Sequence, residues 1–210
     1  MKNLKSFLQE DITIFAPQDQ LKKAKYDEIK IFTDGWQSID LPKPPENLAE
    51  VRLVVQAVES ASPTDISQYK NCDKDASYYV KKVMEANNLF YDNKVVEYIE
   101  EQCVPIIRHY KNYYNRPRPY QVAAYHNIDL KRFKTGTSKT PSYPSGHTVQ
   151  PLMVAFHYAK KYPQVSAEML KGAQICGYGR VIAGLHYPSD YKSGIMLATR
   201  LKEYLNYDKF

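Results

Sequence analysis

Residues 147–161 read HTVQPLMVAFHYAKK, an apolar run of helical length that directly follows Pro144-Ser145-Gly146. Segments 165–185 and 189–206 have the same character, and each is predicted to form a helix. Gly184 and Pro188 indicate that one helix ends between them and that the next begins there. The C-terminal third of the chain is therefore predicted to be a set of packed helices.

The same periodicity extends upstream. A helix with one apolar face is predicted over residues 48–58, and Pro63 is expected to stop it. Further helices are predicted around residues 79–84 and over 95–113, where Pro105 should kink or split the helix. Small residues at helical spacing in segment 165–185 predict a close contact with another helix. The sequence thus predicts an all-α helical bundle of about six helices.

Residues 1–40 have a different pattern. Ile29 and Ile31 alternate with polar neighbours, and Asp34-Gly35 is predicted to close a short hairpin towards Trp36. The prolines of residues 41–46 predict an extended connector. We therefore divide the chain into an N-terminal extension of unknown role, residues 1–40, and one domain, residues 41–210.

The chain has 210 residues, a net charge of +6 and a pI near 9.0, which favours anionic partners. Charged residues interrupt the first twenty positions, so no secretory signal is predicted. No stretch approaches the ~18 apolar residues of a membrane helix. We expect no stable membrane insertion and a cytoplasmic location. The three cysteines form no CxxC pair, and three reduced, buried thiols are expected.

Three short stretches carry polar side chains suited to chemistry. The first, residues 111–119, places Lys111 and Arg118 seven positions apart, followed by a proline that favours an extended backbone. The second is Ser145-Gly146-His147, where a helix start offers backbone N–H groups to an oxyanion beside an imidazole. Alone, the first also fits a solvated basic face, and the second fits a capped helix with an incidental histidine.

The third stretch contains Arg180, His186 and Asp190. A carboxylate four residues after a histidine can hold one ring nitrogen and leave the other as a nucleophile. Alone, this pair also fits two stabilised helix ends. Together, the stretches supply cations and N–H donors for the charged oxygens of a phosphoryl group, and two histidines for the attacking and leaving sides.

In this order and spacing the stretches resemble the type 2 phosphatidic acid phosphatase superfamily. That superfamily includes bacterial class A non-specific acid phosphatases, to which residues 41–200 are most similar, and vanadium haloperoxidases. The matching motifs are Lys111…Arg118-Pro119, Pro144-Ser145-Gly146-His147 and Arg180…His186…Asp190. The resemblance implies the α-helical bundle of this superfamily and a metal-independent acid phosphatase that hydrolyses phosphate monoesters.

The resemblance also implies residue roles. His186 would attack phosphorus and form a phosphohistidine, Asp190 would orient His186, and His147 would protonate the leaving group. The phosphoryl oxygens would be held by Lys111, Arg118, Ser145, Gly146 and Arg180. No cofactor is implied, and vanadate would act as an inhibitor. One departure is Gly179, where the family usually has serine.

Other functions stay open. In a vanadate-dependent haloperoxidase the same residues would bind vanadate as a cofactor, with His186 as its ligand. A lipid phosphate or diphosphate phosphatase would act at a membrane surface. A non-enzymatic basic module would leave the order of the three motifs unexplained, and no nucleic-acid partner is expected. No metal site is predicted, because His186 and Asp190 lack further ligands at short spacing.

Two hypotheses concern the surroundings of the motifs. A basic loop would either attract anionic substrates or be simply solvated; its residues are Lys131, Arg132, Lys134 and Lys139. Tyrosines near the first motif would either line a leaving-group pocket or, the interpretation we prefer, pack half-buried; they are Tyr110, Tyr113, Tyr114, Tyr120 and Tyr125. The partner expected is a small phosphorylated substrate, and class A relatives imply a homo-oligomer.

Overall fold

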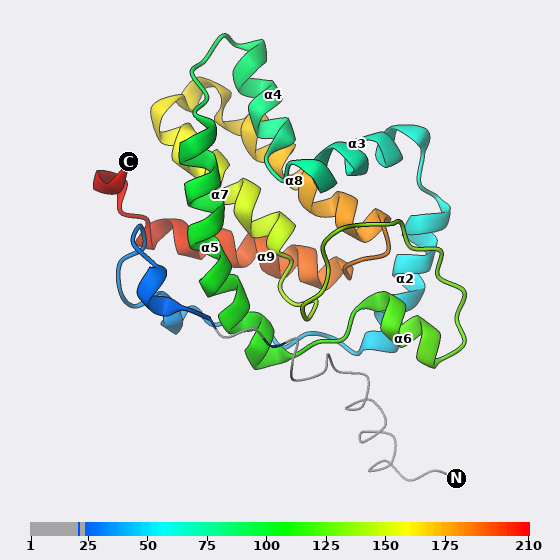
Figure 1. The fold of residues 1–210 in the computed structure, drawn as a ribbon. Coiled ribbons are helices and arrows are strands. Elements are labelled where there is room, and N and C mark those ends of the chain that lie inside the picture. The colour runs from blue at the N-terminus through cyan, green and yellow to red at the C-terminus, as the bar shows by residue number, and fades with distance from the viewer. Residues whose placement is uncertain (1–20, 22–23) are drawn as a thin grey trace.

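The computed structural model describes residue 21 and residues 24–210 (Figure 1). The predicted all-α class is confirmed: within these residues, extended pairing is limited to one antiparallel bridge. The α-helices are α2 (Asn47–Glu59), α3 (Pro63–Lys74), α4 (Tyr78–Ala86), α5 (Asn93–Tyr114), α6 (Pro119–Tyr125), α7 (Gly146–Lys161), α8 (Ser166–Ile182) and α9 (Pro188–Leu201). None of them is both long and apolar enough to cross a bilayer.

The helices α3 and α6 were not expected, and both begin with a proline. Pro63 was interpreted as a stop signal, but it is the first residue of α3. The N–H of a first helical residue has no acceptor within the helix, so a proline there costs no hydrogen bond. Ser62 caps this helix by accepting a hydrogen bond from the N–H of Asp65. Pro119 opens α6 in the same way. Pro105 does not split α5, which continues from Asn93 to Tyr114.

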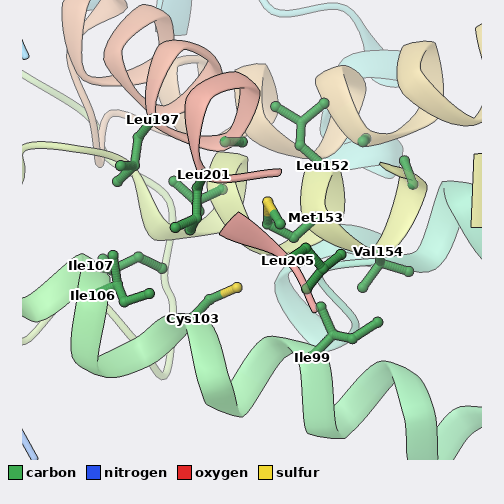
Figure 2. Packing of buried hydrophobic residues seen from close by; sticks show 14 of the residues in the cluster. Ile99, Cys103, Ile106, Ile107, Leu152, Met153, Val154, Leu197, Leu201 and Leu205 are labelled. Carbon is green, nitrogen blue, oxygen red and sulfur yellow. The ribbon is translucent and has the colours of Figure 1, made fainter. Parts of the chain in front are cut away.

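The main core lies where α7 packs against α5, α8 and α9 (Figure 2). Ile99, Cys103 and Ile106 of α5 point toward apolar residues of α7 such as Met153, and all four are buried. This core fixes α5, α7 and α9 relative to one another. The ends of these helices carry the three motifs.

The predicted close contact of α8 is confirmed. A Cβ added to Gly172 would lie 3.0 Å from the backbone of Tyr79 in α4. On another side of α8, a Cβ on Gly177 would lie 2.6 Å from the Thr148 hydroxyl of α7. Both distances are shorter than ordinary contacts, so these backbones approach closely only because the positions carry no side chain.

The predicted N-terminal hairpin is wrong. Gly35 has a φ of 98°, but it leads into a 3₁₀ turn, Trp36–Ser38, and not into a second strand. Phe32 instead pairs with Leu205 near the C-terminus, and Ile31 and Trp36 are buried in the main core. The alternating apolar pattern of residues 29–36 therefore reflects burial of this segment against distant parts of the chain. The domain boundary at residue 40 stays a prediction, and the expectations for residues 1–20 lie outside the described residues.

The expectation of three reduced thiols is also wrong. Cys72 of α3 and Cys176 of α8 form a disulfide, while Cys103 is free and buried. The pairing joins positions 104 residues apart, so nothing in the local sequence indicated it. Disulfides are typical of oxidising compartments, and this one weighs against the cytoplasmic location, which stays a prediction.

Candidate active site

One pocket of about 410 Å³ brings the three motifs together. Six of the eight predicted site residues line it: Lys111, Arg118, Gly146, His147, Arg180 and His186. The other two, Ser145 and Asp190, are buried beside it, and the N–H of Ser145 donates to the carbonyl of Asp190 over 3.1 Å. Residues far apart in the sequence thus converge on a single cavity.

Lys111 and Arg118 reach the pocket from the end of α5 and the segment that follows. Asn115 ends α5 in the left-handed conformation, with a φ of 41°, and its N–H caps the carbonyl of Lys111. Arg118 is extended, as expected for a residue before proline. Lys111 donates to the carbonyls of Pro141 and Ser142, so both cations are held against the loop that leads into α7.

The first residues of α7 supply neutral donors. Gly146 and His147 open the helix, and the first N–H groups of a helix have no acceptor within it. Ser145 precedes them, and its buried hydroxyl oxygen has no hydrogen-bond partner within residues 24–210. An oxyanion at this helix start would receive hydrogen bonds and the favourable end of the helix dipole.

The break between α8 and α9 places the second histidine. Gly184 has a φ of 73°, which lets the chain reverse so that the N–H groups of Leu185 and His186 both reach the carbonyl of Arg180. Pro188 then begins α9, with Asp190 in its first turn. The expected break is confirmed, and the second helix starts at Pro188 as predicted, but α8 ends slightly earlier than predicted, at Ile182.

The two ring nitrogens of His186 have different partners. Nδ1 lies 3.0 Å from Oδ2 of Asp190, and Nε2 lies 3.0 Å from Nη1 of Arg118. The carboxylate can only accept a hydrogen bond and the guanidinium can only donate one. The neutral tautomer that satisfies both carries its proton on Nδ1 and has a lone pair on Nε2, beside the pocket.

The pocket is strongly positive. Burial and then the cations around it lower the pKa of His147 and of His186 well below the usual value. Burial and the neighbouring Arg118 likewise lower the pKa of Lys111, and burial lowers that of Arg118 to about 10. The protonated, positively charged forms of these groups are stabilised when a negative charge enters the pocket. The electrostatics therefore favour an anionic ligand.

Arg180 is positioned by residues that the sequence did not single out. Its Nη1 donates to Asp73 of α3, and its Nη2 lies 2.8 Å from the hydroxyl of Thr137. Its Nε is buried and has no partner within the described chain. Asp73 lies more than 100 positions from Arg180, and no motif marks it. Further residues of the pocket wall that sequence reasoning missed are Val104, Ile107, Arg108, Thr137, Ser138, Thr140 and Gln150.

Residues 100–202 match the family model of the PAP2 superfamily. This part of the chain is therefore similar to the PAP2 superfamily. All eight predicted site residues lie inside the PAP2 region, and the resemblance inferred from the motifs is confirmed. The match begins at residue 100, so it is shorter than the expected range of 41–200.

Two curated relatives match part of the chain. An acid phosphatase of Zymomonas mobilis subsp. mobilis is 37% identical over 89 residues, which are 42% of this chain and 33% of that protein. A non-specific acid phosphatase of Salmonella typhimurium is 33% identical over 84 residues, 40% of this chain and 33% of that protein. The aligned segment thus covers about a third of the length of each curated relative.

A solved structure also resembles the chain. A transmembrane PAP2 type phosphatidylglycerolphosphate phosphatase from Bacillus subtilis aligns over 93% of this chain and 95% of its own, with 16% identity and a TM-score of 0.48.

Outside the PAP2 region, α2 and α3 supply contacts to the site through Glu50 and Asp73. Within it, Gly179 stands where the family usually has serine, and it is buried against Tyr69 of α3. Of the four basic loop residues, only Lys139 lines the pocket. None of the five tyrosines near the first motif lines it. Our preferred interpretation holds for Tyr110, Tyr114 and Tyr120, which are buried or partly buried, whereas Tyr113 and Tyr125 are exposed. Tyr110, for example, is buried and donates to the carbonyl of Ile39.

Proposed function

We propose that this chain is a phosphatase that hydrolyses small phosphate monoesters without a metal ion, through a phosphohistidine on His186. The observation that carries the proposal is the pairing of His186 with Asp190 through Nδ1, beside a buried cluster of cations. The PAP2 match and the acid phosphatase relatives support the same activity.

The phosphoryl group would bind among Lys111, Arg118 and Arg180. These three cations offset the charge on its oxygens, which is the main requirement for catalysis of phosphoryl transfer. The hydroxyl of Ser145 and the N–H of Gly146 would complete the cradle. The unpartnered Ser145 hydroxyl and Arg180 Nε support this arrangement, because buried donors are normally paired.

In the first step, Nε2 of His186 forms a bond to phosphorus while the bond from phosphorus to the leaving oxygen breaks. The imidazole becomes positively charged, and Asp190 stabilises that charge through the Nδ1 proton. In this structure Nη1 of Arg118 lies beside Nε2 of His186, so the guanidinium would shift to the phosphoryl oxygens as the substrate enters.

His147 would donate a proton to the leaving oxygen and later accept one from the water that attacks the phosphohistidine. That second step releases inorganic phosphate and restores both histidines. Burial and then the surrounding cations lower the pKa of His147, which favours the neutral imidazole in the free pocket. The charge of a bound phosphoryl group would offset these cations, so the imidazole gains its proton when substrate is present.

The test is hydrolysis of p-nitrophenyl phosphate in excess chelator. We expect turnover by the wild type and loss of at least about 1,000-fold in His186→Ala, because the nucleophile is removed. His126→Ala, which changes a histidine outside the pocket, is the matched control and should retain full activity. Rapid acid-free quenching with labelled substrate should show phosphate on His186. A folded wild type without turnover, or activity that depends on added metal, would contradict the proposal.

A further inference from the structure

Arg116 lies two residues before Arg118 but serves a different purpose. Its side chain is only 1% exposed, and it is not among the residues that line the pocket. Pro117 separates the two arginines, so that Arg118 reaches His186 from one side and Arg116 reaches Asp190 from the other. Arg116 therefore acts on the proposed nucleophile, His186, through Asp190, the carboxylate that holds it.

Every N–H donor of the Arg116 guanidinium has an acceptor. Nε donates to Asn47, Nη1 donates to Ser189 and Asp190, and Nη2 donates to Glu50 and to a backbone carbonyl. The guanidinium also lies over the ring of Tyr187, 3.8 Å from its centre. A guanidinium has five such donors, so none is left for a substrate.

Both oxygens of Asp190 are held as a result. Oδ2 accepts from His186 Nδ1 over 3.0 Å and from the N–H of Tyr187 over 2.9 Å, while Oδ1 accepts from Arg116 over 2.8 Å. These bonds fix the plane of the carboxylate. The carboxylate in turn fixes the rotation of the imidazole, and with it the direction of the Nε2 lone pair.

Glu50 of α2 holds Arg116 from the opposite side. Its Oε2 accepts from Arg116 Nη2 over 2.7 Å, and its Oε1 accepts from the N–H of Ser189 in the first turn of α9. The buried positive charge of Arg116 thus lies between two carboxylates. Because Glu50 precedes the PAP2 region, a helix outside that region completes the support of the nucleophile.

We infer that Arg116, held by Glu50, is a positioning residue that orients Asp190 and thereby His186 for attack on phosphorus. This inference rests on the proposed function. A purely structural tie between α2 and α9 is the alternative, and it predicts changes in stability without changes in the chemistry of His186.

The test compares Arg116→Lys with Arg52→Lys, a matched control on the exposed face of α2. Lysine keeps the charge but loses the planar fork that reaches Asp190 and Glu50 together. We expect Arg116→Lys to lower kcat about 10- to 100-fold, the size of effect found when a partner that orients a metal-ligating histidine is lost. The inhibition constant of inorganic phosphate should change less than about threefold, since the three pocket cations remain. The control variant, Arg52→Lys, should match the wild type in kcat and in the inhibition constant of phosphate.

A second readout is independent of turnover. In Arg116→Met, one of the cations that lower the pKa of His186 is absent, while Lys111, Arg118, Arg180, His147 and Asp190 remain. The pKa of His186, measured by NMR of the ring nitrogens, should therefore rise, and the acid limb of kcat/KM should move to higher pH. If this variant does not fold, Glu50→Gln should lower kcat in the same direction, with KM unchanged.

Three results would overturn the inference. One is a folded Arg116→Lys variant with wild-type kcat, and another is a loss found only in KM and in phosphate affinity. The third is an unchanged His186 NMR signature in both Arg116 variants. An inactive wild type would contradict the proposed function instead, and the NMR comparison would still decide the role of Arg116.

Discussion

Cys72 and Cys176 form a disulfide that joins α3 to α8, and each cysteine lies close to one member of an ion pair at the pocket. Asp73 follows Cys72 directly, and Arg180 lies one helical turn beyond Cys176, so the disulfide adjoins the Asp73–Arg180 ion pair. The covalent link and the ion pair hold the same two helices together. The position of one pocket cation therefore depends on α3, which lies outside the PAP2 region.

Thiol titration tests the disulfide. The denatured protein should show one thiol, Cys103, without reductant and three after reduction. Replacing Cys72 and Cys176 by serine should lower the free energy of unfolding by about 2–4 kcal/mol, because the unfolded chain loses a long closed loop. Reductant should destabilise the wild type but leave the double variant unchanged. Three thiols in the unreduced, air-exposed protein would contradict the pairing.

Asp73→Asn should weaken the binding of phosphate. The amide has the size of the carboxylate but not its charge, so Arg180 loses its ionic partner while Thr137 remains. We expect the inhibition constant of inorganic phosphate to rise about 3- to 10-fold, an effect of about 1 kcal/mol. Asp65→Asn, at the start of the same helix, is the control. Equal phosphate affinity in wild type and Asp73→Asn would show that Arg180 needs no such partner.

His147→Ala should be sensitive to the leaving group. An alkyl phosphate needs protonation of its leaving oxygen, whereas p-nitrophenolate leaves readily without it. We expect a loss of about 100- to 10,000-fold with the alkyl ester, in the range of general acid catalysis, and a much smaller loss with p-nitrophenyl phosphate. The ratio of kcat values for the two substrates gives the answer. Equal losses would assign His147 a role other than proton donor.

Stability should decrease as the pH falls from about 6.5 to 5.5. The lowered pKa of His147 means that the unfolded chain binds a proton in this window and the folded chain does not. The free energy of unfolding then falls by up to about 1.4 kcal/mol per pH unit for this histidine. Glu100 acts in the opposite sense, because burial raises its pKa to about 7.

Comparison with His147→Gln isolates the histidine, because Glu100 contributes equally to both proteins. Urea unfolding across the pH window should give a steeper slope for the wild type. Saturating phosphate should reduce that difference, since a bound anion offsets the cations of the pocket. Identical slopes in the absence of phosphate would mean that His147 is not kept neutral by its surroundings.

The helices with clear apolar periodicity could be predicted from the sequence. The runs that became α2, α5, α7 and α8 are long enough for a 3.6-residue period to be distinguished from a strand. The helices α3 and α6 are polar or short, and a proline at a boundary marks the start of a helix as well as the end of one. The segment around Ile31 was misinterpreted because alternating burial resembles a strand.

By itself, the sequence determined which groups we propose to carry the chemistry. Spacing along the chain placed Lys111 and Arg118, Gly146 and His147, and the His186–Asp190 pair, since each set depends on local geometry at a helix end. Only the tertiary structure decided what surrounds them. The contacts of Glu50 with Arg116, of Asp73 with Arg180 and of Cys72 with Cys176 join positions far apart in the chain. Such contacts follow from how helices pack, and a single sequence can indicate that a helix face packs closely but not which distant residue it meets.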